Sequence, residues 1–275
     1  MICAWNELLA VLPVHLRAEV NNWKSQCVEE VRLRCQAPPE LVVQGKTVWL
    51  PMECTPEDME FIVNAASRYS PWAAATSSQG FLTVSGGHRI GLCGEVAVKE
   101  GKVHTFREVH SLCIRIARDF SGIAPDLNQL DGSIVILGAP GWGKTTLLRD
   151  LIRKLSGQYH ICVADERGEI FPKGFDRGVM TDVLTGCEKI IGMEMLLRTM
   201  GPSYIAVDEI TSSADSESIL QFINCGITLL ATAHAGSLEE FRQRSVYRPL
   251  VLSGAFQTFL VLHKDKSFSI ERMTL

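Results

Sequence analysis

The segment that most constrains this chain is GAPGWGKT, at residues 138–145. It follows an apolar run, Ser133–Leu137, that predicts a strand, and it precedes Thr145–Leu155, which predicts a helix. The spacing is G-x-x-x-x-G-K-[ST], in which glycines let successive backbone N–H groups turn toward an anion, and the helix N-terminus adds positive potential. The alternative is a chance glycine-rich turn, but the strand–loop–helix context argues against it. The sequence therefore predicts a phosphate-binding loop.

Each position of this loop has an expected role. Lys144 is expected to reach the β- and γ-phosphates of a nucleotide, and the Thr145 hydroxyl to bind Mg²⁺. ATP and Mg²⁺ are therefore the expected cofactors, and the expected activity is that of an ATPase. The other residues predicted to bind the nucleotide are Gly138, Ala139, Pro140, Gly141, Trp142, Gly143 and Thr146.

A second motif, Ser203–Glu209 (SYIAVDE), is an apolar strand that ends in two adjacent acids. Taken alone, such a pair is more often a solvated turn. Downstream of a phosphate-binding loop, at the carboxyl edge where open α/β sheets bind ligands, it indicates a Walker B motif. We expect Asp208 to hold the metal and Glu209 to polarise the attacking water.

Two further strand ends carry polar residues at the same predicted edge. One is Asp165–Glu169, where Glu166 is a candidate catalytic acid; these acids fit either the active site or a surface salt-bridge cluster. The other contains Thr232 and His234, placed to sense the γ-phosphate. A single His at a strand end is more often a hydrogen-bonded structural residue, but this one lies in the predicted crevice.

The pattern of apolar segments predicts two domains. Beyond residue 132, continuous apolar runs alternate with helical stretches, as expected for a mainly parallel sheet with helices on both faces. The runs are Ile134–Leu137, Ile161–Ala164, Tyr204–Val207, Ile227–Ala231 and Phe259–Leu262. We therefore expect an α/β, RecA-like P-loop domain at 133–275, a linker at 121–132, and a smaller α+β domain at 1–120.

The first domain mixes short helical and strand signals. Apolar spacing up to residue 28, interrupted by Pro13, predicts two helices or one kinked helix. Thr55 followed by Pro56 predicts a helix start, with the helix continuing to about Tyr69. The predicted strands are Val28–Cys35, Glu40–Leu50 with a Gly45-Lys46 turn, Phe81–Ser85, Arg89–Ala97 and Ser111–Ala117.

Composition excludes several other classes of protein. The net charge is -4 and the pI is near 6.0, which argues against a generally basic nucleic-acid binder. Nine cysteines, an odd number with no C-x-x-C pair, indicate reduced thiols rather than a disulfide framework or a zinc site. The N-terminus lacks signal-peptide features, and no apolar run approaches the ~18 residues of a membrane span. We expect a cytoplasmic protein.

The four strand-end motifs occur in the order found in secretion and type IV pilus ATPases, and the chain resembles that family. Other segments resemble the stage III sporulation protein AA family of endospore-forming bacteria. These segments are Glu30–Arg34, Gly86–Gly91, Ser111–Arg118, Thr181–Lys189, Gly192–Met193 and Leu197–Pro202. The likeness runs from about residue 28 onward, with two departures. Thr211 and Ala235 stand where glycine is expected.

The resemblance implies a cytoplasmic hexameric ATPase of the mother cell that acts on a channel across the forespore septum. Its implied partners are membrane-associated proteins of the same operon, to which it would be recruited without inserting into the membrane. It also implies that arginines of the first domain approach the nucleotide, and Arg89 and Arg115 are the candidates. The alternative for both is pairing with surface acids such as Glu95 or Glu108.

Two rival functions remain open at this point. The same domain drives nucleic-acid-dependent NTPases, although the acidic pI and the lack of a Lys/Arg run count against that here. An ATP-gated scaffold with little hydrolysis would carry the same motifs.

Overall fold

The computed structural model describes residues 3–23, 28–68 and 80–273, which divide into two compact units. The first unit runs to Asp119 and includes Pro172–Phe175, and the second consists of Phe120–Phe171 and the chain from Asp176 onward. The segment expected to link the domains, 121–132, belongs to the second unit. The Asp150 carboxylate accepts hydrogen bonds from the backbone amides of Ile123 and Ala124 at 2.7 and 2.8 Å, which fixes the start of that segment.

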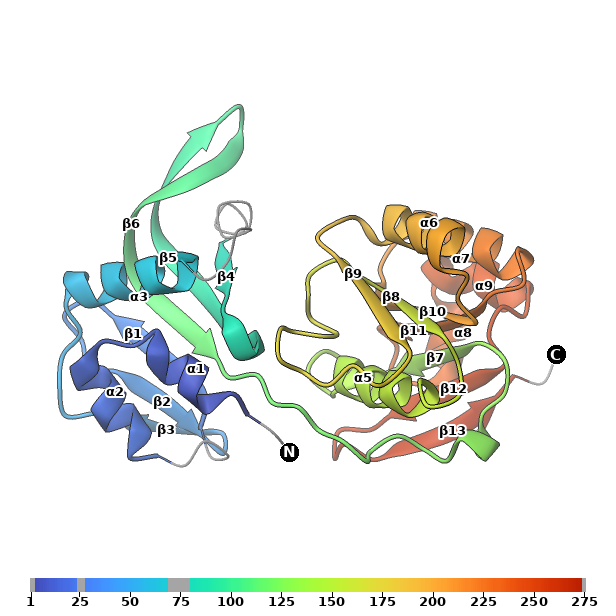
Figure 1. The fold of residues 1–275 in the computed structure, drawn as a ribbon, viewed down its shortest axis with the longest axis horizontal. Helices are drawn as coiled ribbons and strands as arrows, with labels where there is room; N and C mark the ends of the chain where they lie inside the picture. The colour runs from blue at the N-terminus through green and yellow to red at the C-terminus, as the bar shows by residue number, and fades with distance from the viewer. Residues whose placement is uncertain (1–2, 24–27, 69–79, 274–275) are drawn as a thin grey trace. The chain divides into compact units, whose positions relative to one another are not determined.

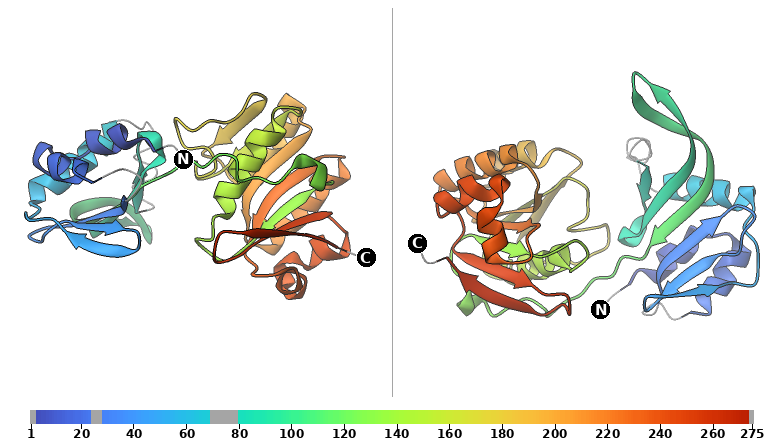
Figure 2. Two further views of the ribbon diagram at one scale, coloured as in Figure 1. Left: turned by 90° about the horizontal axis from the view of Figure 1, so that it is seen from below. Right: turned by 180° about the vertical axis from the view of Figure 1, so that it is seen from behind.

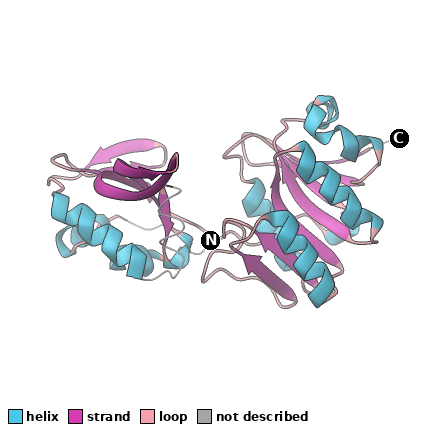
Figure 3. Cartoon of the chain, turned by 90° about the horizontal axis from the view of Figure 1, so that it is seen from above, coloured by secondary structure: helices cyan, strands magenta, loops and turns pink. Residues whose placement is uncertain are grey.

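The first unit is an antiparallel sheet with helices on one face, as Figure 3 shows. The order of its strands is β3-β2-β1-β6-β5-β4. Its elements are α1 (Trp5–Ala10), α2 (Val14–Asn21), β1 (Val28–Arg34), β2 (Glu40–Val43), β3 (Lys46–Trp49), α3 (Pro56–Arg68), β4 (Phe81–Thr83), the 3₁₀ turn η1 (Ser85–Gly87), β5 (Arg89–Lys99) and β6 (Lys102–Arg115).

The core of this unit lies between the helices and alternate strand residues. Val31 and Leu33 of β1 are fully buried together with Leu16 of α2 and Ile62 of α3. Because neighbouring residues on a strand point to opposite faces, the residues between them lie on the other face of the sheet. Arg32 is one of these.

Two details of the first unit, a hairpin turn and the start of β6, differ from the sequence-based expectation. The hairpin turn is formed by Gln44 and Gly45, both with positive φ (50° and 73°), so Lys46 begins β3 rather than closing the turn. The last expected residue of the third helix, Tyr69, lies outside the described residues. Strand β6 begins at Lys102, so the outer halves of β5 and β6 pair only with each other and extend as a twisted ribbon (Figure 1).

The second unit contains a seven-stranded sheet in the order β13-β12-β7-β11-β10-β8-β9. All neighbouring pairs are parallel except β12 with β13. Its elements are η2 (Leu127–Gln129), β7 (Ile134–Leu137), α5 (Lys144–Leu155), β8 (Ile161–Asp165), β9 (Thr181–Thr185), α6 (Lys189–Met200), β10 (Tyr204–Ile210), α7 (Ser213–Asn224), β11 (Thr228–Ala233), α8 (Leu238–Gln243), η3 (Ser245–Tyr247), α9 (Arg248–Leu252), β12 (Thr258–Leu262) and β13 (Phe268–Arg272).

Helices cover both faces of this sheet, so its central strands are apolar on both sides. In β7, Ile134 and Ile136 pack toward α5, whereas Val135 and Leu137 join the cluster formed with α6, α7, α8 and α9. Figure 2 shows the two helical layers from two further directions. The predicted α/β architecture with a mainly parallel sheet is therefore confirmed.

Two strands of the second sheet were missed from the sequence. They are β9 and β13, the two edge strands, and none of their residues is fully buried. Because an edge strand is covered less than a central one, neither shows the continuous apolar run that identified the other strands. Within the described residues no helix combines the length and apolarity needed to cross a bilayer.

Candidate functional site

The phosphate-binding loop lies between β7 and α5, as its motif requires. Gly141 and Gly143 have φ values of 74° and 103°, a backbone region that side-chain-bearing residues rarely adopt. Gly143 directly precedes the first residue of α5, and the Leu147 amide donates back to its carbonyl at 2.9 Å. The glycines therefore shape a loop that leads straight into the helix N-terminus, where an anion is favoured.

The Lys144 side chain is the cation of this loop. Its Nζ donates to the carbonyl oxygen of Ala139 at 3.2 Å and to Nδ1 of His234 at 3.1 Å. Burial lowers the pKa of Lys144 below its ordinary value, and the nearby carboxylates of Asp208 and Glu209 act in the opposite direction. The loop is thus joined directly to the predicted His motif, which belongs to a different strand.

Asp208 is fixed by two threonine hydroxyls, one from the start of α5 and one from β11. The Thr145 hydroxyl donates to its Oδ2 at 2.8 Å, and the Thr232 hydroxyl donates to its Oδ1 at 2.6 Å. Each hydroxyl keeps its lone pairs when it donates, and each carboxylate oxygen keeps a further acceptor position. Thr145 and Asp208 therefore present adjacent oxygen atoms of the kind that Mg²⁺ prefers.

A bulge in β10 brings the two acids to one place. Val207 pairs with Ala231 and Ile210 with Ala233, so Asp208 and Glu209 together face the single residue Thr232. An extra residue of this kind locally re-aims the side chains of a strand. The Glu209 amide donates to the Thr232 hydroxyl at 2.8 Å, which holds the bulge against β11.

Glu209 and His234 are in direct contact, with Oε1 and Nε2 2.5 Å apart. A lysine ammonium can only donate hydrogen bonds, so Nδ1 of His234 accepts from Lys144. A neutral imidazole with its proton on Nε2 then satisfies both contacts by donating to Glu209. The result is a chain of hydrogen bonds from Lys144 through His234 to Glu209.

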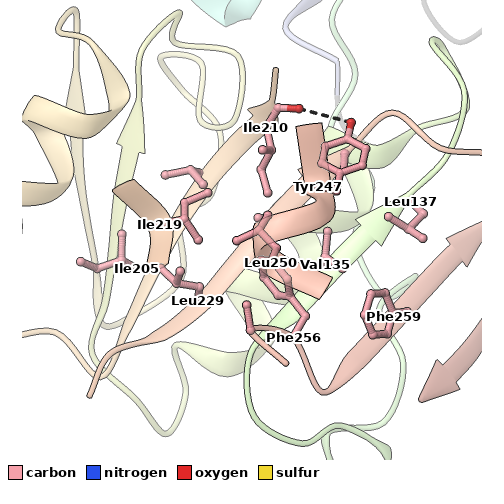
Figure 4. Packing of buried hydrophobic residues seen from close by; sticks show 14 of the residues in the cluster. Val135, Leu137, Ile205, Ile210, Ile219, Leu229, Tyr247, Leu250, Phe256 and Phe259 are labelled. Carbon is pink, nitrogen blue, oxygen red and sulfur yellow. Dashed lines mark hydrogen bonds between the residues drawn. The ribbon is translucent and has the colours of Figure 1, made fainter. Parts of the chain in front are cut away.

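Tyr247 supports this arrangement from the core, and sequence reasoning did not single it out. Its hydroxyl accepts from the His234 amide at 3.1 Å and lies 3.4 Å from the carbonyl of Ile210 (Figure 4). Its ring stacks on Phe241 at a centroid distance of 4.5 Å, and burial raises the pKa of the phenol. One buried side chain thus links the backbone after β10 with the backbone after β11.

The acids that follow β8 have different environments. Asp165 is buried, and its carboxylate accepts the backbone amides of Glu169, Ile170 and Phe171 at 2.9 to 3.0 Å. Burial raises its pKa, while these amides oppose the rise. The Asp165 carboxylate therefore organises the loop that follows β8 and is not part of a surface salt-bridge cluster. Glu166, by contrast, is exposed.

A cleft of ≈ 260 Å³ opens beside Asp208 and Glu209. Seven acidic and two basic residues line it: Asp165, Glu166, Glu169, Glu188, Asp208, Glu209 and Asp215, with Arg167 and Lys189. Residues of the phosphate-binding loop do not line this cleft. Its acidity disfavours phosphate groups, so the loop is the better place for them.

The two departures from the expected glycines are accommodated. Neither Thr211 nor Ala235 has a positive φ, so neither backbone position requires glycine. Ala235 is buried in the core cluster, and the Thr211 hydroxyl donates to Asp215 at 2.9 Å. The left-handed residue in this region is Glu209 itself, with a φ of 53°.

The two candidate arginines lie opposite each other in the first unit, Arg89 on β5 and Arg115 on β6. The Arg89 guanidinium stands 3.9 Å above the ring of Phe81. Arg115 Nε lies 3.4 Å from a carboxylate oxygen of Glu30, and its side chain is 70% exposed. Arg115 thus pairs with an acid, as the alternative expected, and that acid is Glu30.

A predicted phosphate-binding loop after β7, an acidic pair near the end of β10 and a histidine after β11, on a mainly parallel sheet, define the RecA-like ATPase fold. The pilus retraction motor PilT with bound ADP superposes with a TM-score of 0.62 at 16% identity, covering 98% of this chain and 82% of that one. The ATPase DotB of Legionella pneumophila gives 0.58 at 16% identity, covering 95% and 80%. These likenesses establish the fold alone.

The chain belongs to the family "Sporulation stage III, protein AA", whose sequence profile matches residues 5–271. A relative, stage III sporulation protein AA of Bacillus subtilis (strain 168), is 35% identical over 283 aligned positions, covering 95% of this chain and 92% of the relative. Protein SEEDLING PLASTID DEVELOPMENT 1 of Arabidopsis thaliana is 28% identical over 48% of this chain and 21% of that protein.

Proposed function

We propose that this protein hydrolyses ATP at the site formed by the phosphate-binding loop, the Walker B acids and His234. The observation that carries the proposal is the continuous set of contacts Lys144–His234–Glu209 and Thr145–Asp208–Thr232. These contacts group the cation for the phosphates, the oxygen ligands for a metal and a candidate base, and the Glu209 amide, which donates to Thr232, links the two sets. The reaction is in-line attack of water on the γ-phosphorus, in which positioning and electrostatics supply most of the catalysis.

Mg²⁺ fits the donors that this site offers. The Thr145 hydroxyl and the Asp208 carboxylate would hold it, since both are oxygen ligands and lie 2.8 Å apart. Bound there, Mg²⁺ would neutralise negative charge that develops on the phosphate oxygens. Among the described residues no group of three His, Cys, Asp or Glu side chains is placed to hold a metal, which is compatible with a site that the nucleotide itself completes.

Glu209 is the proposed base. One of its carboxylate oxygens accepts from His234, and the other is left to orient and deprotonate water. Its side chain is about one-third exposed and lines the acidic cleft, from which water can reach it. Glu166 lines the same cleft and is the alternative acid.

Two substitutions test this assignment. Lys144→Ala removes the ammonium from the loop and is expected to abolish tight ATP binding, measured with a fluorescent nucleotide. Glu209→Gln keeps the shape of the site but loses the carboxylate, so ATP is expected to bind normally and to turn over ~10²-fold more slowly. Unchanged affinity in the first variant would contradict the loop assignment. Normal turnover in the second variant would mean that Glu166 or Glu169, rather than Glu209, acts as the base.

We further propose that the ATPase works as a cytoplasmic hexamer of the mother cell and energises a secretion-like channel during endospore formation. Membership of the sporulation family supports the setting, and the fold shared with PilT and DotB supports a motor role. The proposed partners are a second copy of the chain and the membrane-associated proteins of the same operon. Crosslinking and pull-down from sporulating cells would show both, and recovery of monomer alone would contradict the ring.

The rival functions give different results in a turnover assay. Strong stimulation by excess nucleic acid would favour a nucleic-acid-dependent NTPase. Tight ATP binding without measurable hydrolysis by the wild-type protein would favour an ATP-gated scaffold.

A further inference from the structure

The backbone conformation of Glu209 is uncommon for a residue that carries a side chain. Its φ of 53° lies in the left-handed region, where a residue with a Cβ carries a strain of about 1 kcal/mol or more. Such a conformation persists only where surrounding contacts impose it. At the bulge this backbone decides where the Glu209 carboxylate points, so whatever holds the backbone also aims the carboxylate.

Two hydrogen bonds hold the backbone of Glu209, one at its amide and one at its carbonyl. The Glu209 amide donates to Thr232, which is a neighbour on the adjacent strand. The Glu209 carbonyl accepts from Nζ of Lys189 at 2.6 Å. Lys189 is the first residue of α6, on a different element, and no sequence motif marked it as part of the site.

Lys189 is itself held firmly in place. Its Nζ lies 3.1 Å from Oδ2 of Asp215, and both side chains are only 12% exposed. The same oxygen of Asp215 accepts the Thr211 amide at 2.8 Å and the Thr211 hydroxyl at 2.9 Å. Asp215 also forms a capping box with Ser212 at the start of α7.

The charge of Asp215 is preserved by these contacts. Burial alone would raise the pKa of its carboxyl, but the Thr211 amide and Lys189 together hold the pKa below its ordinary value. An ionised Asp215 keeps the ammonium of Lys189 beside the Glu209 carbonyl. The pair therefore ties the starts of α6 and α7 to the bulge in β10.

We infer that Lys189 is a positioning residue for hydrolysis, whose ammonium fixes the Glu209 carbonyl and thereby aims the Glu209 carboxylate at His234 and the attacking water. The inference rests on the proposed function of Glu209 as the base. Lys189 itself touches neither phosphate nor metal in this role, since its ammonium is engaged by a backbone carbonyl and by Asp215. Its loss should affect the chemical step rather than nucleotide binding.

The test compares Lys189→Met with Lys189→Arg in the full chain. The methionine variant keeps the length of the side chain and removes the donor, so kcat is expected to fall about 10- to 100-fold, the scale usual for a misplaced catalytic group. The affinity for Mg·ATP should change less than about 3-fold, because Lys189 makes no contact with the phosphate-binding loop. The arginine variant restores a donor and should recover much of kcat.

A matched control removes a similar lysine elsewhere in the second unit. Lys154 Nζ also donates to a backbone carbonyl, that of Pro125, at 2.8 Å, but it lies at the far end of α5 from the loop. Lys154→Met should leave kcat unchanged. Full kcat in Lys189→Met, an equal loss in Lys154→Met, or a loss of ATP affinity that accounts for the slower turnover would each overturn the inference.

Amide hydrogen exchange supplies a readout that does not depend on hydrolysis. In Lys189→Met the amides of Glu209 and Thr211 should exchange at least about 10-fold faster, while those of Ile205 and Val207 in the strand core stay protected. Lys189→Arg should restore slow exchange. If the wild-type protein does not hydrolyse ATP, the proposed function fails, and the exchange data alone still decide whether Lys189 holds the bulge; unchanged exchange would refute it.

Discussion

Replacing Thr232 by valine removes one hydroxyl that forms hydrogen bonds with both Asp208 and Glu209. This hydroxyl is fully buried, accepts the Glu209 amide at 2.8 Å and donates to Asp208 at 2.6 Å. Valine fills nearly the same space, so the change is one of hydrogen bonding rather than of packing. The variant leaves the Glu209 amide without its acceptor and Asp208 without one of its two hydroxyl donors.

The cost follows from these two losses. An unsatisfied amide costs about 1–3 kcal/mol, and a hydrogen bond to a charged group is worth about 1.5–3 kcal/mol. Water from the adjacent cleft can replace part of the second contribution, because Asp208 is only half-buried. We therefore expect Thr232→Val to lower the free energy of unfolding by about 2–4 kcal/mol. Turnover should fall at least about 10-fold as the bulge loosens.

The measurement is urea unfolding followed by circular dichroism, combined with steady-state ATP turnover. Thr232→Ser is the matched control, since it keeps the hydroxyl and loses only a methyl group. The serine variant should lie within about 1 kcal/mol of the wild type and should retain activity. If the valine and serine variants were equally stable and equally active, the hydroxyl would not hold the bulge, and the reasoning about both acids would fail.

Three further predictions follow from other contacts. Asp165→Asn keeps only one acceptor oxygen for three amides, so the loop at residues 166–171 should lose about 1–3 kcal/mol of stability and become more sensitive to limited proteolysis; unchanged sensitivity would contradict this. Because Asp215 has a lowered pKa, its stabilising effect is complete above its unfolded value of ~3.9 and is lost as the pH falls through the lower folded value. The difference in unfolding free energy between wild type and Lys189→Met should therefore shrink below about pH 4. A difference that stays constant with pH would show that the stabilising effect of Lys189 does not depend on the charge of Asp215. Arg89→Ala and Arg115→Ala should bind ATP but turn it over slowly. Mixing either variant with Glu209→Gln should restore activity, because the two defects would lie in different subunits that form one ATP site together. Turnover that is independent of protein concentration, with both arginine variants active, would contradict an ATP site shared between subunits.

The central strands of the second unit could be predicted because a strand buried on both faces is apolar at every position. Ile134–Leu137 is entirely buried and was identified for that reason. The edge strand Thr181–Thr185 has no such run, since only its partner β8 covers it within the sheet. The outer half of β6 was missed for a related reason, because it pairs with β5 alone and its residues are largely exposed.

The membership of the site was easier to predict than its geometry. Lys144, Asp208 and His234 each follow a recognisable strand, and parallel strands bring their carboxyl ends to one edge of a sheet. The bulge at Glu209 depends on the pairing of β10 with β11, which one strand's sequence does not contain. Lys189 lies in one of the segments that carry the family resemblance, but no role could be assigned to it because its contact is with a carbonyl twenty positions away in the chain.

The outermost strands of the second sheet, β9 and β13, bear on how other chains can attach to this unit. Each presents charged side chains, Asp182 on β9 and Glu271 and Arg272 on β13. Charge on an edge discourages a foreign strand from adding to the sheet through backbone hydrogen bonds. Neighbouring molecules are therefore expected to bind this unit through its surface side chains rather than through strand addition. Surface substitutions, which leave the backbone hydrogen bonds of the sheet intact, should then be able to abolish assembly without unfolding the protein.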